Sequence, residues 1–242
     1  MNNYQDKKAM TWKFCAWSGV IYLVGSLIGW AIIAGFIPPP RSEWGAAEMA
    51  SFYRENNTAI KVGLVIALNF QLFYVFFSIG IAKVIDYIEG EGGLLSKLEL
   101  YCGYTNFLIT IAGLFFWLSA AFKAETRLDH DILLANDMGW MWIETMFLAT
   151  LLQYVFVGIA VIFDKRKSKI YPGWFAWYSF ATAFAMWPVS LIPFLYSGPF
   201  AYHGLISLYL VYGMYFLWTG VASVYTVKAI NRIVTSNRLG TE

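Results

Sequence analysis

Two carboxylates at the start of one apolar stretch are the residues best placed to do chemistry. Glu144 lies within the stretch 138–163, and Asp137 precedes it by seven residues. Seven residues return a helix to nearly the same face, about 10 Å further along its axis. A carboxyl group shielded from water can act as a proton donor, a cation ligand or a hydrogen-bond anchor. Glu144 is therefore a candidate general acid with Asp137 as its partner; alternatively, Glu144 snorkels or bonds a neighbouring helix.

Polar side chains in two other apolar stretches are candidate ligand contacts. In the stretch 62–84, Gln71, Tyr74 and Ser78 share one helix face. In the stretch 100–122, one helical stripe carries Gly103, Asn106, Thr110, Gly113 and Trp117. An amide facing lipid would have no hydrogen-bond partner, so this stripe must face protein. Asn106 and Thr110 are the expected partners of Gln71, and the alternative role of all these groups is to hold helices together.

A fifth segment combines two prolines with a serine. The sequence from Trp187 to Pro193 reads WPVSLIP, with Pro188 and Ser190 inside it. Proline inside a helix frees a carbonyl and bends the backbone, which predicts a kinked or broken segment here. Irregular backbone within a membrane is tolerated where it lines a cavity or packs on protein. Trp187 and Ser190 are therefore candidate cavity-lining residues, and a kink without any ligand is the alternative.

The elements that must position these residues are long apolar runs. Crossing a hydrocarbon core of about 30 Å takes about 20 predominantly apolar residues. Six stretches qualify: 14–36, 62–84, 100–122, 138–163, 174–195 and 204–227. They are continuously apolar and do not alternate with polar residues, which favours helices over barrel strands. The predicted fold class is all-α, a bundle of six transmembrane helices that forms a single membrane domain over residues 1–242.

The composition excludes several classes of protein. Hydrophobic residues make up 59% of the chain and charged residues only 13%, against about 25% charged in typical soluble domains. Disordered chains, collagen-like repeats, small disulfide scaffolds and soluble enzymes are therefore excluded. A net charge of +2 argues against nucleic acid as a partner. The two cysteines and two histidines show no metal-ligand spacing, so no metal site is expected and the cofactor is unknown.

The distribution of Lys and Arg predicts the orientation. Basic residues are concentrated in the N-terminal tail, in every second loop and in the C-terminal tail, and the strongest run is KRKSK at 165–169. Cytoplasmic segments carry this excess, so both termini are predicted to be cytoplasmic. The expected location is the inner membrane of a bacterium.

The segment between the first two spans predicts a short helix. It begins with three prolines at 38–40, and Ser42 is the expected N-cap of a helix that continues to Asn56. Ala46, Met49 and Tyr53 share one apolar face of this helix. The pattern is typical of an amphipathic helix lying at the membrane interface. A solvated helix packed on the rim of the bundle is the alternative.

Three segments carry a resemblance to a known family. They are GFIPPP at 35–40, AAEMASFYREN at 46–56 and SGPFAYHG at 197–204. Through them the chain resembles an uncharacterised family of bacterial six-helix membrane proteins, associated with actinobacteria and proteobacteria that degrade steroids and hydrocarbons. The resemblance implies a six-helix fold and a bacterial inner membrane. It implies no catalytic residue, and its link to apolar substrates is one of association.

Three functions remain open. In the first, the protein binds a small apolar or amphipathic molecule, with Glu144, Asn106 and Gln71 at its polar end, or serves as a membrane subunit of a larger complex. In the second, it is a membrane-embedded isomerase or cyclase for a lipid, terpenoid or steroid-like substrate, with Glu144 as general acid. In the third, it is a transporter that dimerises through the small residues Gly25 and Gly29, although no pair of broken helices is expected.

The expected partners follow from these alternatives. The lipid bilayer is common to all of them. A small apolar ligand, a second copy of the chain and a larger membrane complex stay open as further partners, and nucleic acid is not expected.

Overall fold

The computed structural model describes residues 2–90 and 92–239, and no strand occurs among them. Within that part of the chain, six helical segments are long and apolar enough to cross a membrane. They are Lys7–Ile33, Asn57–Glu89, Leu94–Ala121, Asp129–Phe163, Trp174–Phe194 and Leu205–Ser236. The predicted all-helical class is confirmed, and six sufficiently long apolar helices are present in the described chain; that they cross a membrane stays a prediction. Several spans begin earlier or end later than predicted, because the helices continue into polar residues beyond their apolar cores.

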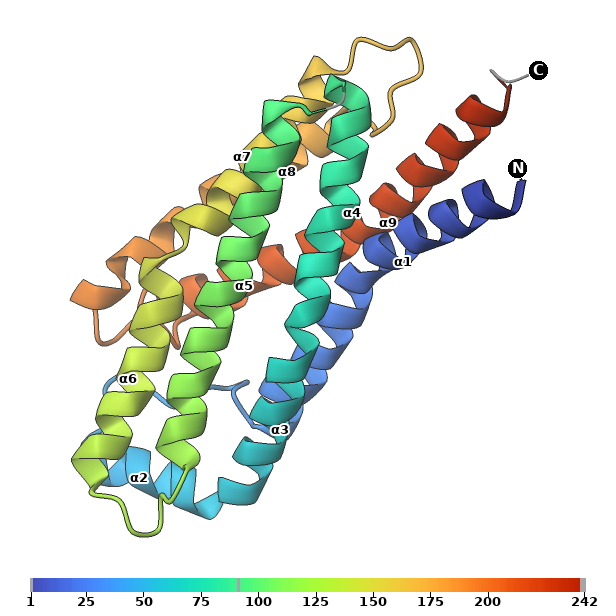
Figure 1. Ribbon diagram of the computed structural model, residues 1–242. Coiled ribbons are helices and arrows are strands. Elements are labelled where there is room, and N and C mark those ends of the chain that lie inside the picture. Colours follow the sequence, from blue (N-terminus) through green and yellow to red (C-terminus); the bar gives the residue numbers. More distant parts are fainter. Residues whose placement is uncertain (1, 91, 240–242) are drawn as a thin grey trace.

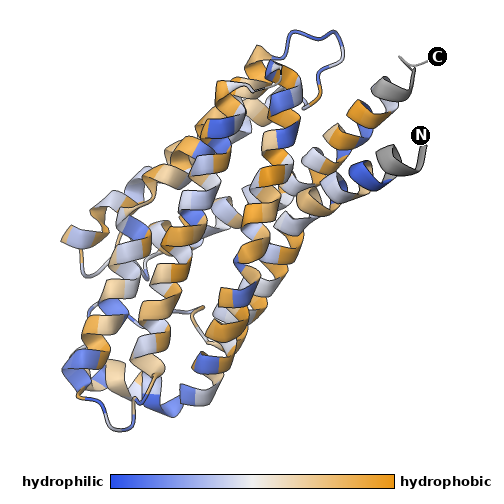
Figure 2. Ribbon diagram, viewed as in Figure 1, coloured by the Kyte–Doolittle hydropathy of each residue, from blue (hydrophilic) through white to orange (hydrophobic). Residues whose placement is uncertain are grey.

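The helices form one elongated bundle with both termini at the same end (Figure 1). The first and last long helices, α1 (Asn2–Ser26) and α9 (Val211–Leu239), lie side by side and point away from the rest of the bundle. We call this end, together with the loop 164–173, the terminal half. The opposite end, which contains α2 (Ala46–Glu55), is the α2 half. Hydrophilic residues gather in the loop 164–173 and around α2, while the helices between them are largely hydrophobic (Figure 2).

Regular α-helix is interrupted in five of the six candidate spans of the described chain. Only α5 (Leu94–Ala121) is continuous. The first span passes from α1 into the π-helix η1 (Leu27–Ile33), and the fifth passes from α8 (Trp174–Ala185) into the 3-10 helix η2 (Trp187–Phe194). The sixth begins with the π-helix η3 (Leu205–Leu210) before α9.

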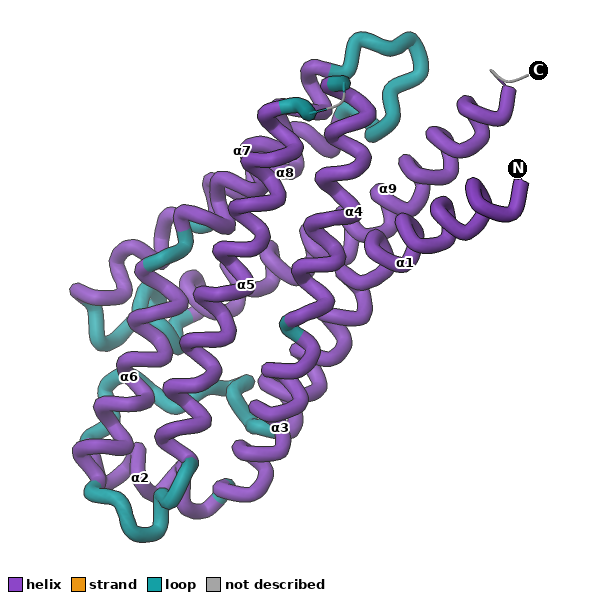
Figure 3. The backbone as a smooth tube through the Cα atoms, in the orientation of Figure 1, coloured by secondary structure: helices purple, strands orange, loops and turns teal. Residues whose placement is uncertain are grey.

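The second and fourth spans each consist of two α-helices. Gln71 separates α3 (Asn57–Phe70) from α4 (Leu72–Glu89), and residues 146 and 147 separate α6 (Asp129–Thr145) from α7 (Leu148–Phe163). Both junctions are visible as short loop segments in Figure 3. The kink predicted for the fifth span is confirmed, since Pro188 and Pro193 both lie in η2. Most junction residues, Gln71 among them, keep right-handed helical dihedral angles, so these spans are irregular helices and the expectation of no pair of broken helices is not contradicted.

Small residues bring η1 and α3 into close contact. A Cβ atom at Gly29 would lie 2.6 Å from the carbonyl oxygen of Gly63, which is too close for any side chain. The neighbouring Gly25 faces the ring of Phe70. The seam predicted from Gly25 and Gly29 therefore exists, but it joins two spans of the same chain. It is not free to serve as the dimer face expected for a transporter.

The helix α2 lies across the end of the bundle. Met49 and Tyr53 are fully buried, and the Tyr53 hydroxyl donates to Asn136 Oδ1 of α6 at 3.1 Å. This packing corresponds to the alternative of a helix on the bundle rim, and the contact of α2 with a lipid surface stays a prediction. The expected cap is wrong: Gly45 is the N-cap, and the Ser42 hydroxyl donates instead to the carbonyl oxygen of Tyr196 at 2.5 Å.

Candidate functional site

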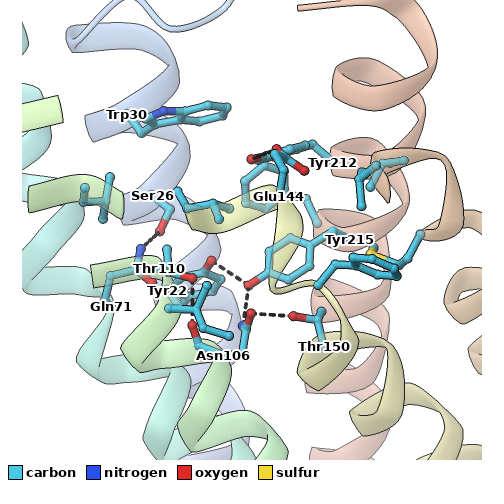
Figure 4. A pocket seen from close by; sticks show the side chains of 18 of the residues that line it. Tyr22, Ser26, Trp30, Gln71, Asn106, Thr110, Glu144, Thr150, Tyr212 and Tyr215 are labelled. Atoms are coloured by element: carbon cyan, nitrogen blue, oxygen red, sulfur yellow. Dashed lines mark hydrogen bonds between the residues drawn. The ribbon is translucent and has the colours of Figure 1, made fainter. Parts of the chain in front are cut away.

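A cavity of about 90 Å³ lies between the two halves of the bundle, where all six candidate spans of the described chain contribute to its wall. Most of the wall is apolar or aromatic, including Trp30, Trp117, Tyr215 and Phe216. A small group of polar side chains converges on it (Figure 4). A mostly apolar cavity with few convergent polar groups is the usual form of a small-molecule site.

Every interruption of α-helix in the described spans meets this wall. Ser26 ends α1, Gln71 separates α3 from α4, and Phe147 lies between α6 and α7. Met186 separates α8 from η2, and Val211 begins α9. Within a membrane, backbone that departs from the α-helix is tolerated where it is covered by protein or lines a cavity. The breaks and the cavity are therefore one feature of the fold.

Glu144 occupies the last turn of α6, next to the break. Its side chain is only 3% exposed, and the Tyr212 hydroxyl donates to Oε1 at 2.6 Å. The second oxygen, Oε2, accepts no hydrogen bond from any described residue. No basic side chain belongs to the wall formed by the described residues. Glu144 can therefore accept a hydrogen bond from, or form an ion pair with, a molecule in the cavity (Figure 4).

Asn106 is the second polar centre of the wall. It accepts a hydrogen bond from the Thr150 hydroxyl at 2.5 Å and donates to the hydroxyl of Tyr215 at 3.3 Å. The Tyr215 hydroxyl also shares a 2.8 Å hydrogen bond with that of Tyr22. Three spans besides that of Asn106 are joined in this way. The prediction that the stripe of α5 faces protein is confirmed.

Gln71 does not pair as expected. Its amide donates to the hydroxyl of Ser26 at 3.3 Å, whereas Thr110 donates to the backbone oxygen of Asn106 in its own helix. The expected bonds from Gln71 to Asn106 and Thr110 are therefore wrong, although all three residues lie on the wall. The reason is the close approach of η1 to α3. It places Ser26, the last residue of α1, within hydrogen-bond distance of Gln71.

An aromatic layer closes the cavity on the side of the α2 half. The ring of Trp30 is stacked between Tyr212 and Trp117, with centroid separations of 5.4 and 6.2 Å. Trp117 contacts Trp140 at 4.7 Å, and Trp140 stacks on Tyr202 at 4.5 Å. Aromatic pairs of this kind add stabilisation beyond their buried area and hold one another in place. The layer therefore connects Trp117 and the cavity to the loop 195–204.

Four predicted site residues lie elsewhere. Asp137 is half-buried and accepts a hydrogen bond from Asn136, about 10 Å along α6 from Glu144. Asp137 does not belong to the cavity wall, so the expected pair of carboxylates is not brought together there. The Trp187 side chain is largely exposed, and Ser190 donates to the carbonyl oxygen of Trp187. Met186 and Val189 line the cavity wall instead. The prediction chose the other residues because the sequence does not indicate which face of η2 turns inward.

The fourth, Tyr74, belongs to a separate polar cluster, which we call the Gln153 hub. The Tyr74 hydroxyl donates to Gln153 Oε1 at 2.7 Å. Gln153 Nε2 in turn donates to Ser78 Oγ at 3.0 Å and to Glu99 Oε1 at 2.7 Å. Sequence reasoning missed Glu99 because it lies one residue before the predicted third span. The available signal was its spacing, four residues before Gly103, which extends the polar stripe of α5 by one turn.

The two histidines do not meet. His130 is exposed on α6, whereas His203 Nδ1 accepts a hydrogen bond from the backbone N–H of Ser42 at 3.2 Å. Burial lowers the pKa of His203, an effect that Glu43 opposes and Arg41 reinforces. No group of three or more His, Cys, Asp or Glu side chains that could hold a metal ion occurs in the described chain.

Comparisons with known protein families, curated proteins and solved structures found no match. The family resemblance of the segments 35–40, 46–56 and 197–204 therefore stays a prediction. The functional reading depends on the geometry of the cavity.

Proposed function

We propose that this chain is a multi-pass protein of a bacterial inner membrane that binds a small apolar or amphipathic molecule in its central cavity. The observation that carries the proposal is that the helix interruptions of the described spans all meet the wall of one cavity. Regular helices would close this space by packing side chain against side chain. Segments that depart from the α-helix have poorer backbone hydrogen bonds, and here they occur at the same place in separate spans. Space for a bound molecule would explain why the fold keeps them there.

The orientation is part of the proposal. Both termini lie at the same end as the loop 164–173, which carries the basic run 165–169 (Figure 1). The excess of Lys and Arg favours a cytoplasmic location for this terminal half. The cavity then lies deep within the bilayer, where a molecule dissolved in lipid can approach it.

The size and polarity of the cavity restrict the ligand. A volume of about 90 Å³ is enough for a small molecule, or for one end of a longer one. Glu144 Oε2 favours a ligand whose polar end is a hydrogen-bond donor or an amine, with an apolar remainder against Trp117 and Phe216.

Cavity-filling provides the direct test. The protein is purified in mild detergent, and bound small molecules are identified by native mass spectrometry and solvent extraction. Thr110→Phe, which places a ring in the cavity, is expected to remove the bound molecule. Thr105→Phe is the matched control, because Thr105 is exposed on the same helix and, like Thr110, donates only to its own backbone.

Glu144→Gln tests the polar end of the same molecule. The Tyr212 hydroxyl can still donate to the amide oxygen, so the fold is expected to persist. Loss of a charged hydrogen bond is expected to weaken binding about tenfold to a hundredfold. A protein that carries no molecule, or whose bound molecule survives Thr110→Phe, contradicts the proposal.

Transport is the second candidate function. The irregular helical segments around one cavity favour it, since helices interrupted beside a mid-membrane site are typical of secondary transporters. Uptake of the identified molecule into proteoliposomes distinguishes transport from binding alone. Catalysis has less support, since Asp137 lies off the cavity wall and Glu144 has no second carboxylate beside it there.

A further inference from the structure

A buried carboxyl group outside the cavity has no role in the proposed function. Glu99 lies in the terminal half of the bundle, in the second turn of α5, and its side chain is completely buried. Its only hydrogen bond among the described residues comes from Gln153 Nε2 at 2.7 Å. Glu99 Oε2 is buried and has no hydrogen-bond partner in the described part of the chain.

The ionised form of Glu99 is poorly accommodated here. A buried carboxylate requires a cation or several donors, because transfer out of water is costly for a charge. No salt bridge reaches Glu99 within residues 2–90 and 92–239. The titratable groups near enough to interact with its charge are Tyr74 of α4, Cys102 of α5 and Tyr171 of the loop 164–173, and none of them is basic.

The protonated form fits the same atoms after one rotation. A half-turn of the Gln153 amide exchanges its nitrogen and oxygen without moving the neighbouring groups. The Glu99 O–H then donates to the Gln153 oxygen, as does the Ser78 hydroxyl, and the amide N–H donates to the Tyr74 hydroxyl. The 2.7 Å separation between Glu99 and Gln153 suits an O–H donor equally well.

We propose that Glu99 is a proton-binding site, in which the Gln153 amide adopts one orientation when Glu99 is protonated and the other when the proton leaves. The proton binds at Glu99 Oε1, and no other group changes its protonation. The site is distinct from the ligand cavity but adjacent to it, since the Tyr74 ring stacks on the cavity residue Tyr215 at a centroid separation of 6.3 Å. Gly103 is required beside it, because a Cβ atom there would lie 2.7 Å from Gln153 Nε2.

Infrared difference spectroscopy tests this site directly. The spectrum of purified protein at neutral pH is compared with that of Glu99→Gln, which preserves size and hydrogen bonding. A carboxylic acid C=O band, shifted in D2O, is expected in the parent protein and absent from the variant. Glu144→Gln is the matched control, since it removes a buried acid from the cavity and should leave the Glu99 band in place.

Two outcomes overturn the proposal. If the parent protein has no acid band that Glu99→Gln removes, Glu99 is ionised and the site is a fixed charge. If the band disappears when NaCl or KCl is added at constant pH, the site binds a metal cation in competition with the proton. Failure to find a ligand in the cavity affects neither result, so this inference and the proposed function are tested separately.

Discussion

The two halves of the bundle differ in the regularity of their helices and in the contacts that hold the helices together. In the terminal half, the spans are regular α-helices, and the Gln153 hub joins α4, α5 and α7 through short hydrogen bonds between buried side chains. In the α2 half, η1, η2 and η3 depart from the α-helix, and a layer of stacked aromatic rings from Trp30 to Tyr202 lies beside hydrogen bonds such as that from Tyr53 to Asn136. The cavity lies where the two kinds of packing meet.

One bundle can therefore combine a rigid, closely packed half with a cavity. Regular helices bring polar groups into fixed register, so the Gln153 amide can bond side chains of α4 and α5 at the same time. Breaks change the direction and rotation of a helix, so side chains on either side cannot all remain in contact. The terminal half is therefore expected to provide stability, and the region at the breaks to provide the site.

Removing the Gln153 amide should have the largest effect. Gln153→Leu leaves Glu99, Ser78 and Tyr74 without their shared partner, and the expected loss is about 3–5 kcal/mol of the free energy of unfolding. Asn106→Leu also removes an amide, but at the cavity, where water can replace it. Its expected loss is about 1–2 kcal/mol. Unfolding in mixed detergent micelles measures both values, and equal losses would show that the two halves do not differ in this way.

Glycine substitutions test whether irregular helices are also loosely packed. Gly29→Ala places a methyl group against the backbone of α3 and is expected to cost about 1–3 kcal/mol. Gly213→Ala in α9 meets no atom within 4 Å, so it is expected to be neutral or to stabilise the helix by up to about 1 kcal/mol. Thermal unfolding in detergent compares the two variants. A neutral Gly29→Ala would mean that the η1–α3 contact yields easily.

A smaller effect is expected from mild acid, which acts on His203 in the α2 half. Burial lowers the pKa of His203, so its neutral form is the one that the folded state favours. The resulting stability is complete above the unfolded pKa, about 6.5, and is lost as pH falls through the lower folded value. The expected loss is less than about 1 kcal/mol, because solvent partly screens the ring.

In the terminal half, the stability contributed by the Asp164 carboxylate is lost at lower pH than that contributed by His203. Burial alone would raise the pKa of Asp164, but hydrogen bonds from the backbone of Ile170 and Arg166, and the Arg166 guanidinium, hold it below its usual range. Its contribution is present above the unfolded value, about 3.9, and is lost only as pH falls through the lower folded value. The thermal transitions of the parent protein and His203→Gln between pH 7.5 and pH 5 check the difference. If both proteins show the same pH dependence, the change in stability comes from a titratable group other than His203.

The sequence alone determined the features that depend on local chemistry. Long apolar runs have to become helices in a membrane, because only helices satisfy their own backbone groups there, and this predicted the six spans. The prolines of the fifth span predicted its departure from the α-helix, and the stripe from Gly103 to Trp117 predicted the buried face of α5. Of the predicted site residues, those on this stripe, together with Gln71 and Glu144, are the ones that line the cavity.

Tertiary structure decided which of these features meet. The partner of Gln71, the burial of Glu99 and the inward face of η2 all depend on which helices are neighbours and on how far each has rotated. Helical periodicity places a residue on a face of its own helix and carries no information about depth or about the helix opposite. A cavity belongs to several spans at once, so it exists only after they have packed.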